Sequence, residues 1–316
     1  MSTVAEPIGT DEPFVHPALF YRDEDEYLGG TVSFVRDGLA AGEPVAVAVP
    51  GDNLRLIRDA LGDDAGAVRL LDMREAGRNP GRIIPGVLRA FADAQPPGTR
   101  VRIIGEPIWA GRSGTEYPAC VQHEALINAA FRGRAATILC PYDIARLPGH
   151  VVADAYATHP TVIPAGARHE QGSDAYAPDA VVARYNEPLS PVPDALVFPF
   201  DAATLSQARH VATAEGARLG LAGVRLEDLA IATAELTTNS VVHAGGSGSM
   251  RVWSEDGYVV CEVRDKGRLA DPLAGRRPAS RDQRGGRGLL LVNLVADLVR
   301  LHTGDQGTTV RCWFAR

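Results

Sequence analysis

The stretch Glu235-Leu-Thr-Thr-Asn239-Ser-Val-Val-His243 decides how the last third of the chain folds. It lies in a segment with helical periodicity from about Arg225 to Val242. Residues four positions apart share one face of a helix, so Glu235, Asn239 and His243 form a polar stripe. A carboxylate and an amide on one face suit a general base beside an oxygen ligand of Mg²⁺. We assign no role to His243, because a histidine at a helix end is usually held there by the helix dipole.

Three glycine-containing motifs follow this helix in a fixed order, Val263-Arg-Asp265-Lys-Gly267, Arg284-Gly285-Gly286-Arg287-Gly288 and Gly307-Thr308-Thr309. A carboxylate at the strand end of the first motif can accept a hydrogen bond from an exocyclic amine such as that of adenine. The second motif opens an apolar helix, where backbone N–H groups and arginine side chains would face phosphate oxygens. Each motif alone is weak evidence of function, whereas the ordered set indicates a nucleotide site.

The four motifs resemble those of the GHKL ATPase domain, which gyrase, the bacterial histidine kinases and the anti-sigma-factor serine kinases share. The resemblance covers residues 195–316 and implies an α+β sandwich with helices on one face of a mixed sheet, binding ATP and Mg²⁺. It matches the N box to Glu235 and Asn239, and the first glycine box to Asp265 and Gly267. It matches the second glycine box to residues 284–288 and the Gly-Thr box to Gly307 and Thr308.

The resemblance also implies a role for each residue in phosphoryl transfer. Glu235 would deprotonate the incoming serine hydroxyl, and Asn239 would hold Mg²⁺. Arg284 would stabilise charge on the γ-phosphoryl group, with Arg287 as the second candidate. The first glycine box usually ends in a second glycine, whereas here Arg268 and Leu269 follow Gly267. We expect the adenine contact of Asp265 to survive, and the flexibility of the ATP lid to be altered.

Among GHKL branches, the chain looks most like the RsbW-type anti-sigma serine kinases of bacterial stress-response regulation. We expect the Pro-rich segment 161–200 not to supply the helical hairpin of a histidine kinase, and we expect no transducer domain after the last strand. The resemblance implies a protein serine/threonine kinase that phosphorylates a serine on a STAS-domain antagonist, sequesters a sigma factor and can homodimerise. Two alternatives stay open, a non-enzymatic ATP-dependent partner-binding switch and an atypical histidine-kinase-like signalling protein.

The first half of the chain predicts a separate α/β domain over residues 13–160, after a loose tail at residues 1–12. We expect a short helix from Gly51 with Asp52 as its N-cap, and a further helix from Pro80 to Ala94. Such helical segments alternate with short apolar strands such as VAVAV from Val45, VRIIG from Val101 and ATILCPYD from Ala136. This alternation is typical of a parallel sheet. The pieces FVHPALFYRDEDEYL, GEPVAVAVP, IGEPIW, CVQHEALINAAF and ILCPYD resemble the MEDS sensory domain, a RecA-like unit. The resemblance implies signal reception without a defined ligand.

A ligand of this domain would lie at the ends of the parallel strands. The residues that we expect around such a sensor pocket are Trp109, Tyr117, Cys120, His123, Glu124 and Tyr142. In the alternative reading, His123 and Glu124 only tie a helix to a strand. The set Cys120, His123, Cys140 and His159 consists of residue types that zinc accepts. Only one pair is closely spaced, so we expect Cys140 to be a small core residue.

Composition excludes several classes of function. The 316 residues carry 32 basic and 39 acidic side chains, and the net charge of −7 argues against nucleic acid as a partner. Lys266 is the only lysine and Gly267 follows it, so no Walker A loop exists. Apolar runs are too short for a membrane span, and no secretory signal begins the chain. We therefore expect a cytoplasmic protein with reduced cysteines.

Overall fold

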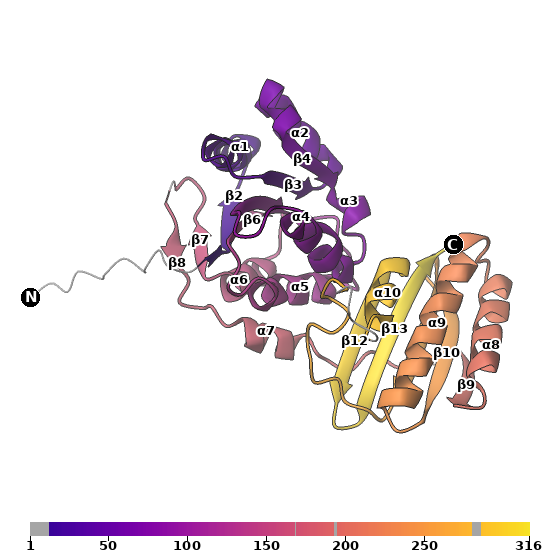
Figure 1. Cartoon of the computed structure of the whole chain (residues 1–316). Helices are drawn as coiled ribbons and strands as arrows, with labels where there is room; N and C mark the ends of the chain where they lie inside the picture. Colours follow the sequence, from indigo (N-terminus) through magenta and orange to yellow (C-terminus); the bar gives the residue numbers. More distant parts are fainter. Residues whose placement is uncertain (1–12, 168, 193–194, 280–285) are drawn as a thin grey trace, which may run out of the picture.

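The computed structural model describes residues 13–167, 169–192, 195–279 and 286–316. Figure 1 shows two bodies, an α/β domain up to α7 and a second domain of antiparallel strands and helices from β9 onward. This is the predicted fold class. Among the described residues, no helix combines the length and the apolar character that a membrane crossing requires.

The sheet of the first domain is parallel except at its last strand. Its strands run in the order β4-β3-β5-β6-β2-β7-β8, and β1 pairs with β6. Their bounds are Phe14–Val15 (β1), Pro17–Tyr21 (β2), Val45–Val49 (β3), Val68–Asp72 (β4), Val101–Gly105 (β5), Ala136–Asp143 (β6), Thr161–Ile163 (β7) and Gln171–Gly172 (β8). The predicted strands within residues 44–143 thus form neighbours in one parallel sheet.

Helices cover both faces of this sheet because side chains alternate along each strand. Val45, Val47 and Val49 pack on the side of α1 (Glu24–Ala40) and α2 (Gly51–Leu61). Ala46 and Ala48 face the opposite side, where α5 (Tyr117–Ala130) and α6 (Gly149–Thr158) pack. The strands are therefore apolar on both faces, which explains the continuous apolar runs in the sequence.

Three local features differ from the sequence-based expectations. The expected helix from Pro80 to Ala94 is divided into a 3₁₀ turn (η2, Pro80–Arg82), a π-helical turn (η3, Ile84–Leu88) and α4 (Arg89–Asp93), because Pro85 lacks an N–H and disturbs the helical hydrogen bonds. Asp52 is not the N-cap of α2, since Pro50 occupies that position. A short helix, α3 (Met73–Ala76), and a 3₁₀ turn, η1 (Gly62–Ala67), flank β4.

The segment 161–194, expected as a Pro-rich linker, carries short elements of its own. β7 adds to the sheet beside β2, with Ala18 opposite Val162. A short helix, α7 (Pro178–Arg184), packs on α5 through Val181, which lies in a small cluster with Val121 and Ala125. The segment therefore extends the first domain before the chain crosses to the second.

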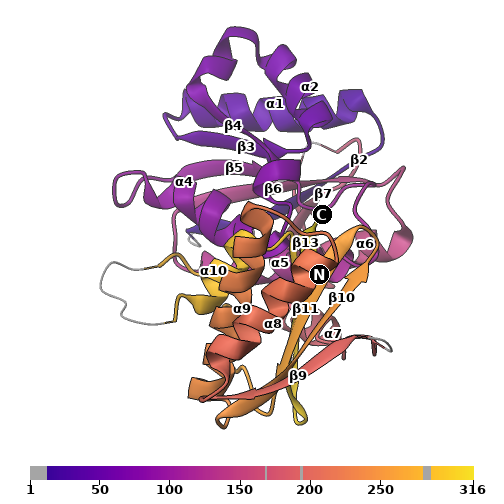
Figure 2. The ribbon, with the colours of Figure 1, turned by 90° about the vertical axis from the view of Figure 1, so that its right-hand side faces the viewer.

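The second domain is a layer of helices on an antiparallel sheet with the order β12-β13-β11-β10-β9. The observed pairs are all antiparallel, so the sheet is not mixed as expected. The strands are Leu196–Asp201 (β9), Ser247–Glu255 (β10), Tyr258–Asp265 (β11), Leu298–Gly304 (β12) and Gly307–Ala315 (β13). The helices are Leu205–Arg218 (α8), Val224–His243 (α9) and Gly288–Val295 (α10), and Figure 2 shows them on one side of the sheet.

The other face of this sheet meets the first domain. Trp253, Leu298 and Trp313 form a buried cluster with Ala119 of α5. Beside them Arg311 forms a buried ion pair with Glu262 at 2.6 Å and donates to the carbonyl of Ser190 at 2.7 Å. The sheet thus lies between its own helices and the first domain.

Candidate functional site

A cavity of about 570 Å³ opens in the second domain between the C-terminal half of α9, the start of α10 and the segment 267–279. Leu236, Val263, Leu301 and Val310 give it an apolar floor. The predicted site residues that line the cavity are Asn239, Asp265, Gly267, Gly286, Arg287, Gly288 and Thr308. Motifs spread over some 70 residues of sequence therefore meet at one apolar hollow with a polar rim.

Asp265, at the end of β11, is held by one hydrogen bond on each carboxylate oxygen. Ser240 of α9 donates to Oδ2 at 2.7 Å, and the backbone N–H of Gly267 donates to Oδ1 at 2.8 Å. Each oxygen keeps a lone pair for a further donor. The carboxylate is thus oriented over the apolar floor, where a flat heterocycle with an amine could lie.

Two hydroxyl groups hold the turn after Asp265 in place. Thr308 donates to the carbonyl of Gly267 at 2.8 Å, and its hydroxyl lies 2.9 Å from that of Thr303. Thr303 in turn accepts from the backbone N–H of Leu269 at 2.9 Å. The Gly-Thr motif therefore supports the first glycine motif from the neighbouring strands.

Glu235 and Asn239 both reach the first residue of α10. A Cβ atom placed on Gly288 would lie 2.7 Å from Glu235 Oε2 and 3.0 Å from Asn239 Nδ2. The N-terminus of α10, whose first N–H groups have no acceptor within the helix and carry partial positive charge, is therefore next to the polar stripe of α9. A carboxylate, an amide and a helix N-terminus lie together at the same end of the cavity.

The structure brings together most of the residues predicted for this site. Glu235 does not line the cavity wall but touches Gly288 at its margin. Arg284 and Gly285 lie outside the described residues. Sequence reasoning missed Ser240 and Thr303, because isolated hydroxyl residues carry no spacing signal. His243, which received no role, lines the cavity.

The segment between the two glycine motifs is docked on the first domain. Leu273 is buried and belongs to the core cluster of the α/β domain. Arg276 has a buried Nη1 atom without a hydrogen-bond partner in the part of the chain that the structure describes, and burial lowers the pKa of Arg276 to about 10. The carbonyl oxygen of Gly275 accepts a hydrogen bond from Asn293 Nδ2 of α10 at 3.0 Å. The backbone carbonyl of Asn293 in turn accepts from Asn79 Nδ2 of the first domain at 2.9 Å.

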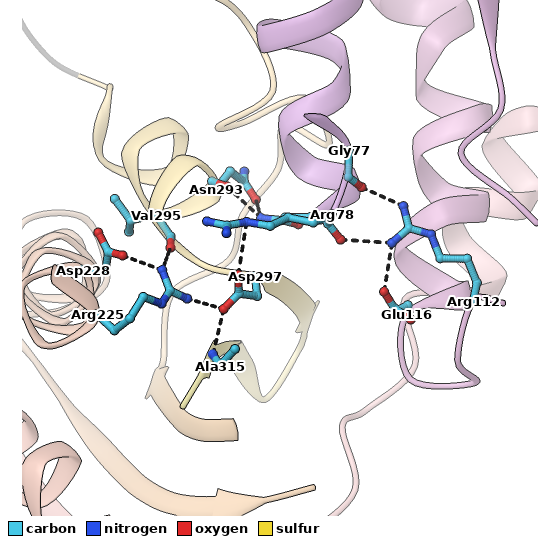
Figure 3. A network of polar contacts seen from close by, with 11 residues as sticks. Gly77, Arg78, Arg112, Glu116, Arg225, Asp228, Asn293, Val295, Asp297 and Ala315 are labelled. Carbon is cyan, nitrogen blue, oxygen red and sulfur yellow. Dashed lines mark hydrogen bonds and ion pairs between the residues drawn. The ribbon is translucent and has the colours of Figure 1, made fainter. Parts of the chain in front are cut away.

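Figure 3 shows a second connection between the domains, centred on Asp297. Asp297 forms ion pairs with Arg225, in the first turn of α9, and with Arg78 of the first domain. The carbonyl oxygens of Arg78 and Gly77 accept from Arg112 at 3.0 and 2.6 Å, and Arg112 pairs with Glu116 at 2.8 Å. A polar chain therefore leads from the helix that carries Glu235 to the start of α5.

The six residues expected around a sensor pocket take up different environments. Trp109 lies under the Arg112 guanidinium, whose central carbon is 4.0 Å from the ring centroid. Tyr117 donates to Asp154 at 2.6 Å. Cys120, His123, Glu124 and Tyr142 are buried, and burial raises the pKa of Cys120 to about 12 and lowers that of His123 to about 3. Cys140 and His159 lie with Glu124 and His16 rather than with Cys120 and His123.

A buried carboxylate in this domain was not anticipated from the sequence. Glu106, directly after β5, is 3% exposed and accepts from Asn53 Nδ2 at 2.9 and 3.0 Å and from Tyr27 at 3.2 Å. Burial raises the pKa of Glu106 to about 8. The position after a strand of a parallel sheet is the signal that could have indicated it.

Comparison with known families finds two family matches along the chain. Residues 15–160 match the MEDS family, described as the methanogen/methylotroph, DcmR sensory domain. Residues 198–314 match the histidine kinase-like ATPase domain family. No curated protein matches the chain.

Proposed function

Because this chain carries a MEDS sensory domain at residues 15–160 and a histidine kinase-like ATPase domain at residues 198–314, we propose that it is an anti-sigma regulatory factor. In this proposal it binds Mg–ATP, phosphorylates a serine on a STAS-domain antagonist and sequesters a sigma factor. The sensory domain adjusts the balance between phosphorylation of the antagonist and sequestration of the sigma factor. The protein acts in the cytoplasm and can form a homodimer.

The observation that carries the proposal is the meeting of Asp265, Asn239 and the N-terminus of α10 around one cavity. The apolar floor suits an adenine ring, and the oriented carboxylate of Asp265 suits its exocyclic amine. The start of α10 offers N–H groups to phosphate oxygens. The residues present therefore fit an adenosine nucleotide from its base to its phosphates.

The residues at the phosphate end supply the chemistry of transfer. Asn239 offers an amide oxygen to Mg²⁺, which would neutralise phosphate charge when bound. Glu235 accepts the proton of the serine hydroxyl as the serine oxygen bonds to the γ-phosphorus. The bond from this phosphorus to the β,γ-bridging oxygen breaks, and ADP leaves. Arg287, and Arg284 before it in sequence, offer guanidinium groups to the phosphoryl oxygens.

The docked segment 268–279 gives the sensory domain a direct route to this site. It forms one wall of the nucleotide cavity, and the same segment also borders an interdomain cavity of about 1060 Å³ that α5 lines from the other side. Leu273 and Arg276 anchor it to the first domain. A change in the packing of α5 would therefore alter how this wall closes on the nucleotide.

Two rival functions predict different products. A non-enzymatic switch would bind ATP to stabilise a partner-binding conformation and transfer nothing, and the altered first glycine box favours it. A histidine-kinase-like protein would carry acid-labile phosphate on its own chain. The retention of Glu235 as a candidate general base beside the start of α10 favours the serine kinase.

The test is phosphoryl transfer from radiolabelled ATP to a STAS-domain protein from the same cells, with the full chain as enzyme. We expect label on a serine of the STAS protein, and loss of at least about 100-fold in rate for Glu235→Ala. Glu227→Ala, on an exposed position of the same helix, is the matched control and should keep the rate. ATP binding without any transfer by the wild type would favour the switch.

Asn239→Ala separates metal-dependent binding from folding. We expect weaker ATP binding in the presence of Mg²⁺ and an unchanged thermal unfolding curve, since Asn239 is only partly buried. Calorimetric titration measures the ATP affinity in the presence and in the absence of Mg²⁺. Unchanged affinity in Mg²⁺ would remove the metal role of Asn239.

A further inference from the structure

Four metal-ligating side chains converge in the core of the sensory domain, away from the nucleotide cavity. His16, Glu124, Cys140 and His159 are all fully buried, and their nearest ligand atoms lie within 4.8 Å of one another. They come from four separate places in the fold, namely the turn before β2, the helix α5, the strand β6 and the end of α6. Nothing in the proposed kinase chemistry uses them.

The spacing of these atoms fits a tetrahedral ion. His16 Nε2 and His159 Nε2 lie 3.4 and 3.3 Å from Glu124 Oε2, and Cys140 Sγ lies 3.4 Å from His16 Nε2. With bond lengths of about 2.0–2.3 Å, neighbouring ligand atoms of a tetrahedral zinc site are about 3.3–3.8 Å apart. Three ligand-atom pairs thus already stand at the separations that such an ion requires, and all four ligand atoms lie within 4.8 Å of one another.

Hydrogen bonds outside the cluster fix which nitrogen of each ring faces inward. Asn128 donates through Nδ2 to the carbonyls of Thr158 at 2.8 Å and Ala125 at 3.1 Å, so its Oδ1 faces His16 Nδ1 at 3.1 Å. An amide oxygen accepts only, so His16 carries its proton on Nδ1. In the neutral ring, the lone pair of Nε2 then points at Glu124 and Cys140.

His159 has the same arrangement. Its Nδ1 lies 2.9 Å from the carbonyl oxygen of Ala155, which makes Nδ1 the protonated nitrogen. Among the residues that the structure describes, its Nε2 has no hydrogen-bond partner, and neither oxygen of Glu124 has one. A ligating histidine whose second nitrogen donates to an oxygen is the usual support of a protein metal site.

Without a cation, the centre of the cluster would collect two nitrogen lone pairs, a thiol and a carboxylate in a dry core. The Cys140 thiol and His16 Nε2 pair with each other at 3.4 Å, but His159 Nε2 and the Glu124 oxygens form no hydrogen bond within the described residues, and such buried groups are costly. A divalent cation would satisfy all four at once. We propose that His16, Glu124, Cys140 and His159 bind a divalent transition-metal ion, zinc being the best match to this donor set.

The site has the character of a closed, structural centre. Four protein ligands complete a tetrahedron and leave no position for water. The ligands join the sheet to α5 and α6, so the ion would stabilise the packing of these helices. Because α5 also contacts the ATPase domain through Ala119, the ion lies beneath the helix on which that domain rests.

Metal content and cobalt spectra of the full chain test the proposal. We expect about one zinc ion per chain after purification without chelator. After the zinc is removed by unfolding with chelator, refolding with Co²⁺ should give the visible bands of tetrahedral cobalt and a thiolate charge-transfer band. Zinc added afterwards should abolish these bands.

Matched variants separate this site from the other cysteines and histidines. Cys140→Ser should lose the charge-transfer band, whereas Cys120→Ser, another buried cysteine of the same domain, should keep it. Asn128→Ala retains all four ligands, and we expect it to weaken metal binding by about 10–100-fold. Absence of zinc and of a cobalt spectrum in the wild type would overturn the proposal. Persistence of the band in a folded Cys140→Ser protein would do the same.

Discussion

Ser240 determines how Asp265 is presented to a ligand. It is buried, it follows Asn239 on α9, and it gives its proton to the Oδ2 atom of Asp265. The hydrogen bond joins the helix that carries the N-box residues to the strand that carries the first glycine motif. One hydroxyl therefore couples two motifs that sequence analysis treats separately.

Replacing Ser240 by Ala should remove one of the two hydrogen bonds that orient the carboxylate of Asp265. A hydrogen bond to a charged group contributes about 1–2 kcal/mol, so we expect ATP affinity to fall by roughly five- to thirtyfold. Calorimetric titration measures this change. Ser254→Ala, at an exposed position of β10, should bind as the wild type does, and equal affinities of all three proteins would contradict the role of Ser240.

The raised pKa of Glu106 predicts that the stability of the folded chain depends on pH. This pKa is raised by burial to about 8 in the folded chain, whereas an unfolded glutamate titrates near 4.3. Between these values the folded chain keeps a proton that the unfolded chain releases, so stability should fall as pH rises, by an amount of order 3 kcal/mol between pH 5 and 8. Urea unfolding at several pH values measures it.

The variant Glu106→Gln keeps the shape of the side chain and removes its titration. Its stability should therefore change less with pH than that of the wild type. Glu24→Gln, exposed in the first turn of α1, should retain the wild-type slope. Identical slopes for the wild type and Glu106→Gln would show that the carboxyl group is not neutral in the folded chain.

At the scale of elements, the glycines that begin α10 and β13, Gly288 and Gly307, are needed for different reasons. At Gly288 an added Cβ meets the ends of flexible side chains, Glu235 and Asn239. At Gly307 it would lie 1.9 Å from the backbone oxygen of Asp265, and φ is +109°. The first glycine gives room to the site, and the second is needed by the fold.

Alanine substitutions distinguish these two functions. Gly288→Ala should keep stability within about 1 kcal/mol and lower ATP affinity and transfer about tenfold, because Glu235 and Asn239 must move. Gly307→Ala should lower the free energy of unfolding by more than about 2 kcal/mol. Thermal unfolding and nucleotide titration of both variants measure this, and a stable Gly307→Ala or a fully active Gly288→Ala would contradict it.

Elements with a strong pattern were predictable from the sequence. The apolar run at Ala136–Asp143 is β6, and the helical spacing around Glu235 lies within α9, because burial on both strand faces and on one helix face leaves a clear period. Residues 80–94 are helical as predicted, but the 3₁₀ and π turns within them left no signal in the spacing, since Pro85 changes the hydrogen bonding only locally. Of the cluster around His16, the sequence pointed to Cys140 and His159 but grouped them with Cys120 and His123, because the members come from four distant segments and share no spacing.

On the scale of the whole molecule, Leu273 ties the two domains together. It belongs to the wall of the nucleotide cavity and to the core of the sensory domain. Leu273→Ala should cost about 2–3 kcal/mol of this docking, and amide hydrogen exchange in residues 268–279 should become faster. Leu294→Ala, a half-exposed position of α10, is the control, and unchanged exchange in Leu273→Ala would contradict the docking.

The most direct test of the nucleotide site is a crystal structure of the full chain with Mg²⁺ and a non-hydrolysable ATP analogue. We expect the adenine amine within about 3 Å of the Asp265 carboxylate. The metal should lie on the amide oxygen of Asn239, and the phosphates at the start of α10 beside Glu235. A nucleotide bound elsewhere, or an empty cavity at saturating analogue, would contradict the account.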